Sequence, residues 1–121
     1  MVKNDESRFE RGLAKLAEVD GKEVNGLLES LGDLGRYIVE FGFGDIYSRE
    51  GLSIREREIA TVAILTALGA RDPQLRIHLR ASLKAGITKD ELEELIIHTV
   101  PYAGFPTAIN AMNTLNEINL L

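Results

Sequence analysis

Apolar residues recur at three- and four-residue steps along most of this 121-residue chain, and that period predicts helices. Nowhere do four consecutive residues alternate between apolar and polar as they would in a half-buried strand. About six helices with short connections are expected, and short turns join antiparallel neighbours. The sequence therefore predicts an all-α fold, a compact helix bundle that forms a single domain over residues 1–121.

Capping signals set the expected bounds of these helices. A serine or threonine followed three residues later by glutamate can satisfy two free backbone donors at a helix start. An aspartate before a proline gives a comparable start, and a glycine often ends a helix. These signals predict helices over residues 7–19, 53–69, 72–86 and 88–101, with further helices over 23–41 and 106–118. Pro101 is expected to kink or end its helix because proline has no backbone donor.

Glycines complicate the second helical stretch. They predict either a break near Gly32 or a close contact with a neighbouring helix. Residues 41–51 carry three glycines and are expected to form a loop whose aromatic side chains are partly buried. In the second and last helices, the apolar positions expected to face the core are Val24, Leu27, Leu28, Leu31, Leu34, Ile38, Phe41, Ile109, Met112 and Leu115.

The helix over residues 53–69 differs from the others in having no polar face. Between residues 59 and 68 only Thr61 and Thr66 are polar. Such a helix needs cover on every side. A chain of this length supplies little of that cover, so contacts with other subunits are expected.

Charge and composition exclude several classes of function. The formal net charge is -5, so a nucleic-acid or anionic-membrane surface, which needs a clustered positive field, is not expected. No apolar run reaches the roughly 20 residues that span a bilayer, and the first twenty residues lack the apolar core of a signal peptide. A cytoplasmic protein is expected. The chain has no cysteine, which excludes disulfides, thiolate metal sites and dithiol redox chemistry.

One histidine, His78, lies among three arginines in this acidic chain. Histidine titrates near neutral pH and can pass a proton if a neighbouring group holds its tautomer, although a structural histidine in the core is an alternative. The arginines at positions 71, 76 and 80 can bind a carboxylate through paired donors. They can equally be solvated or paired with acidic residues of the chain.

Three further residues are candidates for chemistry. Glu58 is the last charge before the apolar run, so it is either a buried acid–base group or an ordinary first-turn acid favoured by the helix dipole. His98 precedes Pro101 and has the same two interpretations. Tyr102 can donate to an oxyanion or fill the core. The two histidines are twenty residues apart and neither has a partner histidine at helical spacing, so no metal site is expected.

Three segments together resemble the gamma-carboxymuconolactone decarboxylase family. They are EIATVAIL at 58–65, LRIHLRASLKAGITKDEL at 75–92 and YAGFP at 102–106. The segment FGDIYSREG at 43–51 is similar to the corresponding loop of the decarboxylases themselves, and the resemblance covers residues from about 34 to 111. It implies an alkylhydroperoxidase D-like helical fold and assembly into trimers or hexamers, with a hexamer expected.

The resemblance also separates two kinds of chemistry. The peroxidase-like branch carries two cysteines before the shared histidine, which is His78 here, and an upstream glutamate that corresponds best to Glu58. This chain has Arg71 and Gln74 at the cysteine positions, so it is not a thiol peroxidase. The decarboxylase branch needs no cofactor, because the lactone carbonyl of its substrate accepts the electrons that carbon dioxide leaves behind.

The expected function is decarboxylation of a small carboxylated lactone such as gamma-carboxymuconolactone, with no cofactor and no metal. In this hypothesis His78 donates the proton and Glu58 orients it or balances its charge. Substrate carboxylates bind Arg49 and one of the three arginines on the following helix, and His98 or Tyr102 faces the oxyanion. The alternative is a non-catalytic oligomeric protein of the same fold that binds a small acid or serves as a scaffold.

Overall fold

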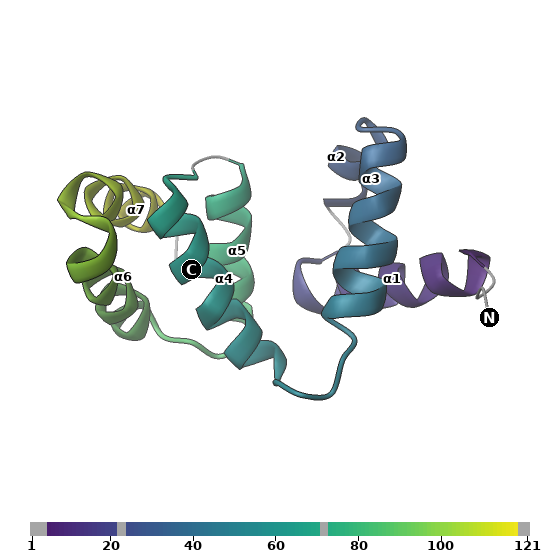
Figure 1. Cartoon of the computed structure of the whole chain (residues 1–121), viewed down its shortest axis with the longest axis horizontal. Helices are drawn as coiled ribbons and strands as arrows, with labels where there is room; N and C mark the ends of the chain where they lie inside the picture. Colours follow the sequence, from purple (N-terminus) through teal and green to yellow (C-terminus); the bar gives the residue numbers. More distant parts are fainter. Residues whose placement is uncertain (1–4, 22–23, 71–72, 119–121) are drawn as a thin grey trace. The chain divides into compact units, whose positions relative to one another are not determined.

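A computed structural model describes residues 5–21, 24–70 and 73–118 of the chain. The described part contains seven α-helices, one π-helix and no strand, so the predicted all-α class is confirmed (Figure 1). The chain divides into two compact units, Met1–Ser53 and Ile54–Leu121, and each is described by itself below. That residues 1–121 form a single domain stays a prediction.

The first unit consists of four helical elements, α1 (Asp5–Val19), α2 (Asn25–Glu29), α3 (Asp33–Tyr37) and η2 (Ile38–Ile46). Helix α1 begins before Ser7, so the expected capping position lies inside the first turn, where a serine costs a helix little. The predicted break near Gly32 is confirmed. Gly32 separates α2 from α3 with φ of 61°, in the left-handed region that favours glycine.

The expected loop over residues 41–51 is wrong in its first half, because η2 continues to Ile46 as a π-helix. Close packing against α1 explains why glycines are tolerated here. A Cβ atom on Gly44 would lie 2.8 Å from the backbone oxygen of Arg8, and one on Gly12 would lie 2.1 Å from that of Val39. The glycines therefore allow α1 and η2 to approach each other. Phe43, in the same segment, is buried and stacks on Tyr47 with ring centroids 5.0 Å apart.

An acidic residue in η2 joins the two packed helices. Asp45 accepts hydrogen bonds from Arg8 Nε at 2.9 and 3.0 Å and from Arg11 at 3.2 Å. Hydrogen bonding from Arg8, with the charges of Arg8 and Arg11, holds the pKa of Asp45 below its ordinary value of 3.8. At any pH at which Asp45 is ionised in the unfolded chain, it is therefore also ionised in the folded chain.

The apolar stripe predicted for the second stretch is largely exposed instead of buried. The exposed positions, at 41% to 59% of their full surface, are Leu27, Leu31, Leu34 and Phe41. The buried positions of η2 are Val39, Glu40, Phe43 and Gly44, and α1 packs against this element with its own buried residues Leu16 and Val19. Spacing alone predicted which residues share a face but not which face the neighbouring helix occupies.

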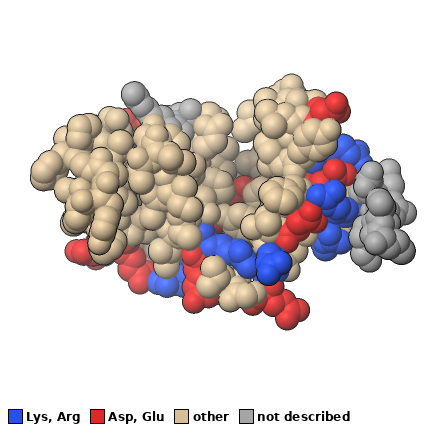
Figure 2. All heavy atoms as spheres, in the orientation of Figure 1, with Lys and Arg blue, Asp and Glu red and all other residues tan. Residues whose placement is uncertain are grey.

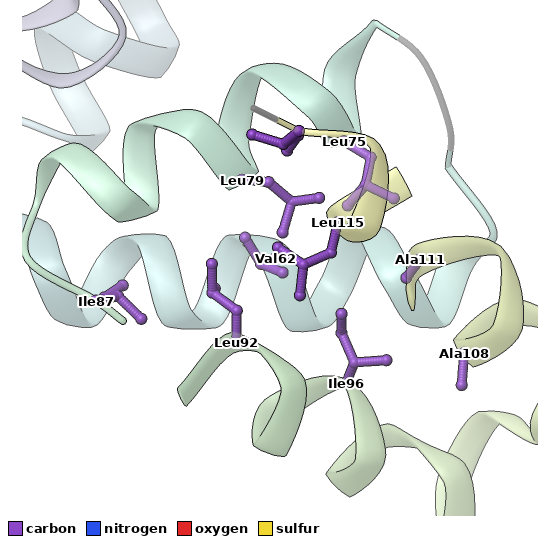
Figure 3. Close-up of a cluster of buried hydrophobic side chains, with 10 residues drawn as sticks. Val62, Leu75, Leu79, Ile87, Leu92, Ile96, Ala108, Ala111 and Leu115 are labelled. Atoms are coloured by element: carbon purple, nitrogen blue, oxygen red, sulfur yellow. The ribbon is translucent and has the colours of Figure 1, made fainter. Parts of the chain in front are cut away.

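The second unit contains α4 (Ile54–Leu68), α5 (Gln74–Lys84), α6 (Lys89–Ala103) and α7 (Phe105–Glu117). The expected bounds of α4, α6 and α7 agree with the structure to within one residue except at Pro101. Helix α5 ends two residues before the expected Gly86, and the start expected at Asp72 lies outside the described residues. Helix α4 packs against the other three. The shared core is made of side chains with almost no exposed surface, drawn in Figure 3: Val62, Leu75, Leu79, Ile87, Leu92, Ile96, Ala111 and Leu115.

A capping box begins α6 as predicted. The backbone N–H of Glu91 donates to Thr88 Oγ1 at 3.1 Å, and the backbone N–H of Thr88 donates to Glu91 Oε1 at 2.9 Å. Arg55 on α4 donates to the other carboxylate oxygen of Glu91 at 2.6 Å. The backbone hydrogen bond from Thr88, followed by that from Arg55, lowers the pKa of Glu91 from its ordinary value of 4.5.

The structure departs from expectation at two positions near the end of the chain. Pro101, expected to kink or end its helix, does not end α6, which continues to Ala103, where Gly104 donates to the carbonyl of Val100 at 2.9 Å. A kink at Pro101 stays a prediction. The helix ends at Gly104, whose φ is 90°. Ile109 does not face the core but is 54% exposed. Ala108 and Ala111 take the buried positions of α7 instead, beside Leu115.

Large apolar side chains remain on the surface of the second unit. They belong to α4, α6 and α7 and are Ile64, Leu68, Ile97, Phe105 and Ile109. Figure 2 shows the visible surface over α6 and α7 almost free of charged side chains, apart from its lower edge. Among the described residues, no helix is both long and apolar enough to cross a membrane.

Candidate active site

Helices α4 and α5 bring together the two residues predicted to carry the chemistry. Glu58 and His78 are each the fifth residue of their helix, and the two helices lie against each other (Figure 1). Oε1 of Glu58 lies 2.9 Å from Nδ1 of His78. Twenty residues separate the pair in sequence, so their contact depends on helix packing.

The burial of the pair indicates how its protons are arranged. The Glu58 side chain has no exposed surface, whereas 18% of the His78 side chain is exposed. A carboxylate that carries its charge can only accept hydrogen bonds, so in that state Nδ1 of the imidazole donates to Glu58.

The helix segments that carry the pair belong to the core. Val62, one turn after Glu58 on α4, and Leu75 and Leu79 on α5 are fully buried. Ser82 is also fully buried, and its hydroxyl donates to the backbone oxygen of His78 at 2.7 Å. Core packing therefore fixes the backbone from which both side chains of the pair project.

The arginines of α5 lie on a different side of the helix from His78. Residues two positions apart on a helix are separated by about 200° around its axis, so Arg76 and Arg80 both project away from His78. Arg76 donates to Glu117 on α7 at 2.6 Å, and Arg80 is exposed. The contact between Arg76 and Glu117 could not be predicted from local spacing, because 41 residues separate the two partners. Arg71 lies outside the described residues.

The other predicted site residues lie elsewhere. His98 is exposed and lines an open groove of about 600 Å³ with Ile59 and Ala63 of α4. Tyr102 is 82% exposed, and its ring centroid is 5.9 Å from that of His98. Arg49 is exposed and belongs to the first unit. Roles for these residues in substrate binding stay predictions.

Comparison with known proteins places the chain in a family. The sequence profile of the carboxymuconolactone decarboxylase family matches residues 32–117. The chain is also 45% identical over 120 residues to the 4-carboxymuconolactone decarboxylase of Acinetobacter baylyi, a match that covers 95% of this chain and 89% of the relative. The chain belongs to the carboxymuconolactone decarboxylase family.

Two more distant relatives extend the comparison. A nitrosuccinic acid decarboxylase of Metarhizium robertsii is 28% identical over 119 residues, covering 91% of this chain and 82% of the relative. An uncharacterized 15.0 kDa protein of Paracoccus denitrificans is 34% identical over 82 residues, or 67% of this chain and 61% of the relative. Membership of the carboxymuconolactone decarboxylase family, together with two relatives named as decarboxylases, supports a decarboxylase role for the chain.

Proposed function

We propose that this chain decarboxylates a small carboxylated lactone such as gamma-carboxymuconolactone, without a cofactor. The contact between Glu58 and His78 carries the proposal, because it joins a fully buried carboxylate to a partly exposed imidazole. The similarity to a 4-carboxymuconolactone decarboxylase over nearly the whole chain supports the choice of substrate.

The reaction needs a group that accepts an electron pair and a group that donates one proton. The bond between the ring carbon and its carboxylate breaks, and carbon dioxide leaves. The electron pair of that bond moves through the ring double bond onto the lactone carbonyl, whose oxygen becomes negatively charged. The charge then returns to the ring as a carbon accepts a proton, so the net change is loss of carbon dioxide and gain of one proton.

In this proposal His78 supplies the proton from Nε2. The ionised Glu58 stabilises the imidazolium form that precedes transfer and holds Nδ1 in its protonated state. Arg49 and one of Arg71, Arg76 and Arg80 are the cations proposed for the substrate carboxylates. Arg71 is preferred among these three, because Arg76 and Arg80 project away from His78 and Glu117 also neutralises Arg76. His98 and Tyr102 keep their proposed role at the oxyanion.

Replacing the proton donor tests the proposal. In His78→Ala we expect carbon dioxide release from the lactone to fall by about a hundredfold or more, because general acid–base catalysis contributes on that order. Circular dichroism and sedimentation should match the unchanged chain. Asn113→Ala, at an exposed position of α7, is the matched control and should retain full activity.

Two results would overturn the proposal. An unchanged rate in His78→Ala would remove the histidine from the reaction. Stabilisation of the chain by small dicarboxylates in a thermal-shift assay, without any turnover of the lactone, would instead favour the binding or scaffold function.

We also propose that the chain assembles with copies of itself, as a hexamer or a trimer. The apolar side chains left exposed on α4, α6 and α7 support this proposal, since monomers rarely expose large contiguous apolar patches. The uncharged surface over α6 and α7 in Figure 2 is the kind of surface that a subunit interface buries.

A further inference from the structure

We propose that the first unit contains a separate binding site, a pocket that takes a small organic cation with an apolar body, such as an aromatic ammonium ion. The pocket has a volume of about 360 Å³ and is lined by residues of α1, α2, α3 and η2. Volumes of about 300–1,000 Å³ are usual for ligand sites. The inference does not depend on the proposed function, because Glu58 and His78 belong to the second unit.

Two glycines shape the pocket where α2 meets α3, and both line it. Gly32 turns the chain between the two helices with φ of 61°, a value that favours glycine. Gly35 lets the helices approach closely, since a Cβ atom there would lie 1.9 Å from the backbone oxygen of Leu28. The apolar walls of the pocket come from α1, α2 and η2 and are Phe9, Leu13, Leu16, Leu28 and Val39.

The charged side chains that line the pocket are Glu29, Asp33 and Arg36, and they leave it negative. Nε of Arg36 donates to the buried carboxylate of Glu40 at 3.0 Å, and Cζ of Arg36 lies 4.5 Å from the centroid of the Phe9 ring. The charge of Arg36 is therefore already balanced. Glu29 and Asp33 are exposed, and neither forms an ion pair within the described part of the chain. The pocket thus combines apolar walls with two unbalanced negative charges that face solvent.

An ammonium ion with an aromatic body matches both properties of the pocket. Apolar walls favour burial of the aromatic ring, because burial removes apolar surface from water. The carboxylates of Glu29 and Asp33 attract a cation and repel an anion. The lactone proposed as substrate carries a carboxylate, so this pocket disfavours it. The two units would therefore bind ligands of opposite charge.

Binding of benzylammonium chloride to the full chain tests the inference. Methyl NMR signals of the pocket residues Leu13, Leu28 and Val39 should shift with a Kd on the order of 1 mM, as expected for so small a ligand. Signals from the core of α4 to α7 should stay unchanged. Benzyl alcohol has nearly the same shape without the charge and should bind roughly fivefold more weakly. Benzoate, an anion, should bind more weakly still.

A double variant identifies the charges that hold the cation. Glu29→Gln combined with Asp33→Asn removes both charges and keeps the side-chain shapes, so the affinity for benzylammonium should fall roughly fivefold, to that of benzyl alcohol. Glu10→Gln combined with Glu50→Gln is the matched control. It removes the same net charge from exposed positions that do not line the pocket, and it should bind like the unchanged chain.

Three results would overturn the inference. The methyl signals of the pocket residues could stay unmoved by benzylammonium, or benzylammonium and benzyl alcohol could bind equally well. The two double variants could also weaken binding equally, which would show that net charge and not this pocket attracts the cation. Failure of the chain to turn over the lactone would reject the proposed function and leave this inference standing.

Discussion

A carboxylate without exposed surface is costly unless another group balances it, and Glu58 meets this requirement through His78. The hydrogen bond between them orients the imidazole through Nδ1, so the contact that makes burial tolerable also positions the histidine for its proposed role in proton transfer. At the scale of the residue, stability and proposed catalysis therefore depend on one interaction.

Glu58→Gln separates these two effects. The glutamine has the same shape and its side-chain oxygen can still accept the proton on Nδ1, so we expect the helices to remain folded. It cannot balance an imidazolium ion, and kcat for decarboxylation should fall by about a hundredfold or more. Steady-state kinetics and circular dichroism measure the two quantities. Full activity in this variant would show that the charge of Glu58 has no part in the reaction.

At the scale of the element, the first unit depends on the close approach of α1 and η2. A methyl group on Gly44 would meet the backbone of Arg8 at 2.8 Å, whereas one on Gly42 in the same helix would meet nothing within 4 Å. We therefore expect Gly44→Ala to lower the free energy of unfolding of this unit by about 1–3 kcal/mol. Gly42→Ala, the matched control, should be neutral or stabilise it by up to about 1 kcal/mol.

Native-state amide hydrogen exchange checks this prediction, because it reports the two units separately. Protection should fall among the amides of α1 and η2 in Gly44→Ala and stay unchanged in α4 to α7. Equal protection in Gly44→Ala and Gly42→Ala would show that α1 and η2 pack less closely than they do in the structure.

The hydrogen bonds from Arg8 and Arg11 to Asp45 make the stability of the first unit depend on pH. Because the folded pKa of Asp45 lies below the unfolded value, its contribution to stability is present above the unfolded pKa and is lost as pH falls through the folded pKa. We expect Asp45→Asn to be less stable than the unchanged chain at pH 7, and the difference to shrink below pH 3.8. Urea denaturation at a series of pH values measures the difference in stability between the two chains. A difference that does not change with pH would contradict the prediction.

These elements also show what the sequence can predict. Thr88 and Glu91 carry their capping signal within four residues, so the start of α6 was predictable from local chemistry. The π-helix over residues 38–46 was not, because its glycines fit only against a partner helix that is distant in sequence. At the site, His78 and Glu58 were selected from their residue types and a family resemblance, whereas the neutralisation of Arg76 required α7 to be in place.

At the scale of the whole molecule, many large apolar side chains of the chain are exposed, and monomeric proteins rarely expose large apolar patches. Each unit has its own set: Leu34, Tyr37 and Phe41 in the first, and Ile97, Phe105 and Ile109 in the second, all more than half exposed. The all-apolar part of α4 adds Leu68 at 77% exposed. Contacts with further copies of the chain would bury such positions, which is why we propose assembly.

A single charge in the uncharged surface of the second unit tests assembly directly. Ile109 is 54% exposed on α7, so Ile109→Asp should leave the core of its unit intact. Burying an unpaired carboxylate in an apolar interface costs several kcal/mol, and we expect sedimentation velocity to show mostly smaller species at concentrations where the unchanged chain is a hexamer or trimer. Ser7→Asp places the same charge at an exposed position of α1 in the first unit and should not change an assembly that is formed through α7. If both variants sediment like the unchanged chain, α7 lies outside the interface, and if the unchanged chain is itself a monomer, the proposed assembly is wrong.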